Sequence, residues 1–260
     1  MKYFLYNFQL FMLILMRMLG LFAVSPFFSS PMIKTTLRVM IAFLVTILIF
    51  PLVGTMKIVI PDNLYFYFLL VAMEVIIGLI MGFLASVFFA IFQMSGQYFS
   101  MLMGLGISEV LDPLTQVQVP VVGQMLTLTA LLVFFSIHGE HLLLSALVQS
   151  YQTLPILNFV DPLSVSFLTK HFLTTFSQLF FLSMKLALPI MGTMIVLMVS
   201  LGLLSKAAPQ MNILMVGFPL QLAVGYVSLV IIAPLFGKAV YRVFEIMNSN
   251  ILALVSLWKT

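Results

Sequence analysis

Few side chains in this sequence could take part in chemistry, and the densest group of them is His138-Gly-Glu140-His141. Imidazoles and a carboxylate are ligand types that zinc accepts. The spacing differs from HExxH, in which two histidines four residues apart share one face of a helix, and no other ligand cluster is visible. The motif therefore favours a polar helix entry at a membrane surface, and we predict no metal site and no cofactor.

Three charged residues, Arg17, Glu74 and Lys185, lie inside long apolar segments. In lipid each charge costs at least about 2.5 kcal/mol on insertion scales, so these side chains should face protein or water. A chain of such groups could relay protons or ions. One acid and two bases favour instead a pairing that fixes the register between helices or subunits.

Glycines follow Glu74 on its own helix face. Gly78 and Gly82 stand four and eight residues after it, which places all three on one side of a helix. Small residues at this spacing predict the close approach of a second helix.

The stretch GLGISEVLDP, residues 104–113, carries two of the seven acidic residues, Glu109 and Asp112. It follows a helical stripe of small and polar residues, which should face water or a polar partner. The stripe is Ser86, Ala90, Gln93, Gln97, Ser100 and Gly104. These features predict a helix with one water-exposed polar face, which ends in a flexible loop near a polar cavity. An ordinary solvent-exposed turn explains the loop equally well.

Enzymatic activity is not expected. The chain has no cysteine and therefore no thiolate nucleophile or disulfide. It lacks a phosphate-binding loop and a GxSxG motif, and nothing in the sequence positions a base beside a serine. Its lysines and arginines are scattered, whereas nucleic-acid binding needs a clustered basic face, so we expect no nucleic-acid partner.

The elements that would position these residues are apolar helices. Of 260 residues 63% are hydrophobic and 7% are charged, whereas a soluble domain averages about 25% charged residues. An all-α integral membrane protein, a single domain over residues 1–260, is predicted, in contact with membrane lipid. Its six apolar segments are Phe8 to Phe28, Val39 to Val53, Leu64 to Phe92, Val119 to Ile137, Phe172 to Leu204 and Ile213 to Phe236.

The apolar segments differ widely in length. A simple span needs about 20 apolar residues, and several of the segments are much shorter or longer. Such uneven lengths suit helices that pack on partner proteins. Ser25-Pro26 should end the first helix, and Asp62 or Asn63 should cap the third.

One stretch resembles a known family closely. KAAPQMNILMVGFPLQ, residues 206–221, is similar to the signature of the FliR family of flagellar type III export-gate proteins, called SctT in injectisomes. Other stretches match in order, so that the resemblance covers nearly the whole chain. They are RMLGLFAVSPFF (17–28), EVIIGLIMGF (74–83), GLGISEVLDP (104–113), HGEHLLLSALVQSYQTLP (138–155) and LALPI (186–190).

The resemblance implies a subunit of the export gate, packed in a helical assembly with FliP-like and FliQ-like subunits and contacted by an FlhB-like protein. It implies a pore through which unfolded flagellar proteins are secreted. The place would be the flagellar basal body at the bacterial inner membrane.

The resemblance also implies that the loop 105–113 plugs the closed pore. The plug candidates are Gly104, Leu105, Gly106, Ile107, Ser108, Glu109, Val110, Asp112 and Pro113. Relatives often carry phenylalanine where this chain has Ile107 and Val110. Aliphatic side chains in a narrow constriction still exclude water and ions.

The signature stretch should shape a contact with partner subunits, through Pro209, Gln210, Gly217, Phe218 and Pro219.

Three other functions compete with the export gate. A secondary transporter subunit would suit broken helices and buried charges, although no two-fold repeat is obvious. A lipid-modifying membrane enzyme would need His138 or His141. A purely structural assembly protein would differ from the gate only in having an inert loop.

Overall fold

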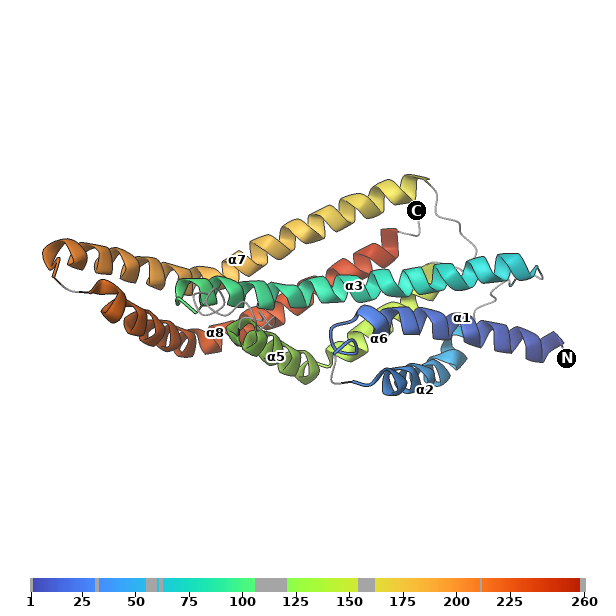
Figure 1. Ribbon diagram of the computed structural model, residues 1–260. Coiled ribbons are helices and arrows are strands. Elements are labelled where there is room, and N and C mark those ends of the chain that lie inside the picture. The colour runs from blue at the N-terminus through green and yellow to red at the C-terminus, as the bar shows by residue number, and fades with distance from the viewer. Residues whose placement is uncertain are drawn as a thin grey trace. The chain divides into compact units, whose positions relative to one another are not determined.

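A computed structural model describes residues 2–30, 33–54, 60, 63–105, 121–153, 162–210 and 212–257. Every regular element in these ranges is an α-helix, as Figure 1 shows. The helices are α1 (Lys2–Val24), α2 (Thr35–Gly54), α3 (Leu64–Leu102), α5 (Val121–Ser136), α6 (Gly139–Thr153), α7 (Pro162–Ala207) and α8 (Ile213–Leu257). The predicted all-α fold is confirmed.

Five of these helices are long and apolar enough to cross a membrane, and α5 with α6 makes a sixth if the pair is one broken span. This agrees with the six apolar segments expected from the sequence. The longest helix, α7, has 46 residues, which at 1.5 Å per residue is about 70 Å, more than twice a hydrocarbon core of about 30 Å. Neither α7 nor α8, with 45 residues, is a simple span.

Two predicted helix boundaries are confirmed. α1 ends at Val24, directly before Ser25-Pro26. The backbone N–H of Tyr65 donates to the side-chain oxygen of Asn63 at 3.0 Å, so Asn63 is the N-cap of α3 and satisfies one of the free amides at its start.

The contacts divide the chain into two compact units. Unit 1 comprises residues 1–88, 138–175 and 245–260, and unit 2 comprises 89–137 and 176–244. The long helices α3, α7 and α8 contribute residues to both units. The single domain expected from the sequence stays a prediction.

Unit 1 is built on a close crossing of α1 and α3. A Cβ atom at Gly20 would lie 2.5 Å from the carbonyl oxygen of Val75, and one at Gly82 would lie 2.6 Å from that of Leu21. A Cβ at Gly78 would overlap the carbonyl oxygen of Arg17. The two backbones therefore touch, and the approach predicted from Gly78 and Gly82 is confirmed. α2 packs against α1 and α6 in the same unit.

Unit 2 has an apolar centre. Its buried cluster consists of Phe99, Met103, Val122, Ala187, Ile190 and Met194. A second group of rings joins Phe89, Phe92, Phe134, Phe236 and Phe244 through edge-on and tilted contacts. Polar links are sparse, and one of them is the hydroxyl of Ser95, which donates to the carbonyl oxygen of Ser183 at 3.0 Å.

Candidate functional site

The C-terminal end of α3 carries the first of the candidate plug residues. Gly104 has a φ of 78°, a left-handed conformation that glycine adopts without a steric penalty. Its N–H donates to the carbonyl of Met101 at 3.2 Å, and the N–H of Leu105 donates to that of Ser100 at 3.0 Å. These two bonds form a Schellman motif, the standard helix ending with glycine just past the last helical residue. Gly104 therefore directs the chain out of α3 at a defined angle.

This turn lies against α8. A Cβ at Gly104 would stand 3.1 Å from Cε2 of Phe218 and 3.3 Å from Oε1 of Gln221. One turn further along α8, a Cβ at Gly225 would stand 2.6 Å from Cγ of Met103. Residues three and seven apart share a helix face, so Phe218, Gln221 and Gly225 form one strip that receives Met103 and Gly104.

The signature stretch, residues 206–221, runs from the end of α7 through the turn into the start of α8. Pro209 and Gln210 are exposed at the turn. Asn212 caps α8, since the N–H of Met215 lies 3.1 Å from its backbone carbonyl and 3.4 Å from its side-chain oxygen. Pro219 lies inside α8. Proline has no N–H, so the backbone bond to the carbonyl four residues earlier is missing there.

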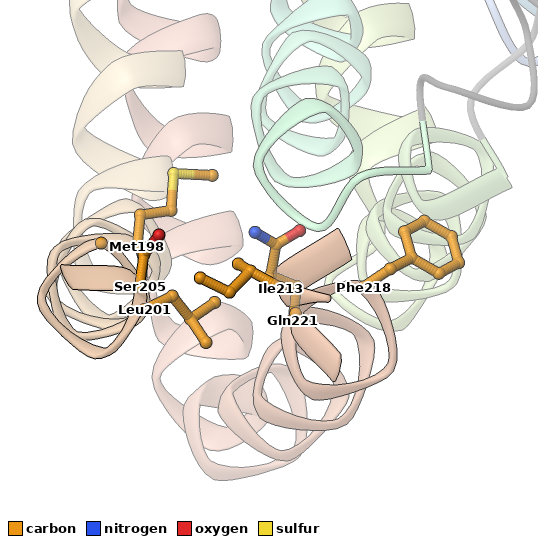
Figure 2. Close-up of a pocket in the computed structure, with 8 residues that line it drawn as sticks. Met198, Leu201, Ser205, Ile213, Phe218 and Gln221 are labelled. Carbon is orange, nitrogen blue, oxygen red and sulfur yellow. The ribbon is translucent and has the colours of Figure 1, made fainter. Parts of the chain in front are cut away.

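A pocket of about 330 Å³ opens between α7 and α8 near this turn. Figure 2 shows Met198, Leu201 and Ser205 of α7 on one side and Ile213 and Gln221 of α8 on the other. Phe218 also lines the pocket, and its labelled ring points away from the α7 residues. Gly217 is buried and Pro219 is exposed. The five signature residues named from the sequence are thus gathered at one hairpin.

Two of the three charges in apolar segments meet in unit 1. Arg17 and Glu74 are 0% and 1% exposed and form a two-pronged ion pair, with Nε to Oε2 at 2.5 Å and Nη2 to Oε1 at 2.8 Å. Nη1 of Arg17 donates to the hydroxyl of Ser150 at 2.7 Å. The guanidinium lies 3.8 Å from the ring centre of Tyr151, whose hydroxyl donates to the carbonyl of Ile14 at 3.4 Å.

This polar cluster joins α1, α3 and α6. A paired and hydrogen-bonded arginine needs no water, which is how an apolar bundle tolerates the charge. Ser150 and Tyr151 were not singled out from the sequence. Their distance from Arg17 along the sequence gives no indication of a contact. The adjacent serine and tyrosine, in a helix with several other polar residues, could have been proposed as hydrogen-bond partners for the arginine.

The third charge, Lys185, is separate. Its side chain is exposed on α7, with Nζ 6.0 Å from the ring centre of Phe181.

His138, Glu140 and His141 do come together, with the Glu140 Oε1 3.6 Å and 3.1 Å from Nδ1 of the two histidines. Both rings are more than three-quarters exposed. Two exposed histidine rings around a partly buried glutamate are typical of a solvated helix entry.

Most of the predicted plug falls outside the described residues. These are Gly106, Ile107, Ser108, Glu109, Val110, Asp112 and Pro113. Only Gly104 and Leu105 can be placed, and Leu105 packs against the buried cluster of unit 2.

Comparisons with known proteins agree with the resemblance. Residues 8–247 match the family described as bacterial export proteins, family 1. The chain is 28% identical over 260 residues to the flagellar biosynthetic protein FliR of Bacillus subtilis, covering 96% of this chain and 97% of that one. It is 32% identical over 237 residues to FliR of Escherichia coli, covering 90% and 88%. Identity to the Yop proteins translocation protein T of Yersinia pestis is 29% over 220 residues, or 84% of each chain. The chain belongs to family 1 of the bacterial export proteins, as the hairpin signature and the end of α3 predict.

Proposed function

We propose that this chain forms part of the wall of a flagellar export pore in the bacterial inner membrane and that its segment 105–113 closes the pore at rest. The chain is a subunit of a type III protein export apparatus. The observation that carries this function is the family match over residues 8–247. The similarity to two FliR proteins and to the Yop proteins translocation protein T supports it. It favours the export gate, the function expected from the sequence, over the alternative of a secondary transporter subunit.

The apolar surface of α7 and α8 supports an assembly. In the most apolar 18-residue stretch of each helix, this chain buries 22% in α7 and 17% in α8, against 56% in α3. Helices longer than a bilayer is thick cannot cover such faces with lipid alone. We propose that FliP-like and FliQ-like subunits cover them, that an FlhB-like protein contacts the assembly, and that unfolded flagellar proteins pass through it.

The plug proposal rests on the place where the segment starts. The Schellman motif at Gly104 ends α3 and sends the chain onward at a defined angle. Ile107 and Val110 would then supply the apolar bulk that keeps water out of a constriction. Glu109 and Asp112 would favour cations in any leak.

Glycine substitutions test the plug. In assembled gates, Ile107→Gly with Val110→Gly should raise the permeability to ions and small solutes, measured as conductance in lipid vesicles, because the apolar bulk is removed. Ile107→Leu with Val110→Ile keeps that bulk and is the matched control. Equal permeability of the two double variants would show that the segment does not seal the pore.

A pull-down tests the contacts of the hairpin. Replacing Pro209 and Gln210 by alanine should reduce co-purification with FliP-like and FliQ-like chains, because the two side chains are exposed at the turn between α7 and α8. Ser249→Ala, an exposed change at the far end of α8, is the control. Complexes of full size and composition would remove the hairpin from the contact surface.

A further inference from the structure

The turn that ends α3 depends on a residue pair far away in the sequence. Phe218 and Gln221 supply the atoms nearest to the Cβ position of Gly104. A Cβ at Gly104 would stand 3.1 to 3.3 Å from these atoms, closer than ordinary van der Waals distances of about 3.5 to 4.0 Å. Glycine at position 104 is therefore favoured twice, once for its left-handed φ and once because a Cβ would press on the Phe218 ring.

A second contact reinforces the first. Met103, which is fully buried, lies against the bare backbone of Gly225, one turn beyond Gln221 on α8. Two consecutive residues of the α3 ending thus rest on one strip of α8. A helix end held at two points keeps its direction, whereas a single contact would let it pivot.

α8 has a weak point beside this strip. Pro219 follows Phe218 directly and removes a backbone hydrogen bond, and the residue before a proline is disfavoured in the helical region. On the α7 side, the 330 Å³ pocket leaves space beside Gln221. A displacement of the hairpin can therefore reach Phe218 and Gln221 without breaking the rest of α8.

We propose that Phe218 and Gln221 are positioning residues for the C-terminal turn of α3, so that the α7–α8 hairpin sets where the segment after Gly104 begins. A partner that moves the hairpin would then shift the start of that segment. The proposal deepens the plug function and rests on it, since the position of the turn matters for export only if segment 105–113 closes the pore.

The absence of cysteine makes the contact directly measurable. Leu105→Cys gives one thiol next to the turn, and a water-soluble maleimide reports how readily that residue leaves the buried cluster. The rate is compared in assembled gates between the parent and three variants. Phe218→Ala removes the ring, Phe218→Tyr keeps it, and Leu220→Ala is a control because Leu220 is equally exposed at 40% and is not among the atoms nearest to Gly104.

We expect Phe218→Ala to raise the labelling rate about tenfold, the factor that about 1.4 kcal/mol of lost contact energy corresponds to. The rate should stay within about twofold for Phe218→Tyr and Leu220→Ala, a change below about 0.5 kcal/mol. The same Phe218→Ala gates, without the added cysteine, should leak ions while the two other variants stay closed. If Phe218→Ala gates do not assemble, Gln221→Asn, which only shortens the second contact, is measured in the same way.

The outcomes separate this inference from the plug itself. Equal labelling rates in all assembled variants would overturn the contact as an anchor. Faster labelling without a leak, in a preparation where the Ile107→Gly and Val110→Gly gates do leak, would leave the plug standing and overturn its control by the hairpin. If those glycine gates stay closed, the plug fails and this inference loses its role in export, whatever the labelling rates.

Discussion

The interior of unit 1 and the interior of unit 2 are stabilised by different interactions. At the centre of unit 1, Arg17 and Glu74 form a buried ion pair, and two helix backbones touch through glycines. At the centre of unit 2, methionine, phenylalanine and aliphatic side chains pack without a buried charge among the described residues. Lipid removes most of the hydrophobic drive between helices, so close packing and polar bonds decide their association.

The two kinds of interior differ in how much rearrangement of their helices they allow. A two-pronged ion pair has one good geometry, whereas methionine is flexible and fills gaps of varied shape. Unit 1 therefore behaves as a fixed frame. Unit 2, which holds the end of α3 and the α7–α8 hairpin, can tolerate a small shift of its helices.

The largest effect should come from breaking the ion pair. Glu74→Ala leaves the Arg17 charge buried without its partner, which costs about 3 to 5 kcal/mol. We expect most of the protein to be lost from the folded peak in size-exclusion chromatography in detergent. Arg17→Met combined with Glu74→Leu removes both charges and should restore much of the folded protein. A double variant as poor as the single one would mean that the pair itself, and not the unpaired charge, sustains unit 1.

A smaller effect should follow from adding one methyl group at the α1–α3 crossing. Gly78→Ala places a Cβ on the backbone of Arg17, which cannot rotate away, and overpacking of this kind costs about 1 to 3 kcal/mol. Gly192→Ala in unit 2 is the control, since nothing lies within 4 Å of its Cβ position. The apparent melting temperature should fall for Gly78→Ala only. Equal melting temperatures would show that the α1–α3 crossing is not tight.

The smallest effect should come from the same change in the centre of unit 2. A Cβ at Gly225 would meet Cγ and Cε of Met103 and Cε of Met194, at 2.6 to 2.7 Å. Methionine side chains can adopt other rotamers, so we expect a cost of about 1 kcal/mol or less. A melting temperature lowered as much as by Gly78→Ala would contradict the flexibility assigned to unit 2.

The elements were largely predictable from the sequence because long apolar runs can only be helices in such a chain. The boundaries were less so. The apolar segment expected to end at Phe236 continues as helix to Leu257, since polar residues on one face, such as Asn250, do not interrupt a helix whose other face is apolar. α6 was not among the predicted segments because its polar residues hide the apolar face.

The candidate site was predictable only in part. The charges Arg17 and Glu74 stood out individually, but their pairing with each other joins residues 57 positions apart, which no local pattern encodes. Gly104 looked like a source of flexibility, and the structure gives it a defined turn because the next N–H reaches back to Ser100. The strip on α8 that receives this turn depends on packing between distant segments.

The Arg17–Glu74 pair also constrains the order of events during synthesis. Arg17 is translated first and meets its carboxylate only after α3 has been made, and Ser150 later still. Until then α1 carries a lone arginine in an apolar run, with an insertion cost of about 2.5 to 3.5 kcal/mol at a helix centre. α1 should therefore stay near the translocon until α3 arrives, so that the two helices enter the bilayer as a pair and not one after the other.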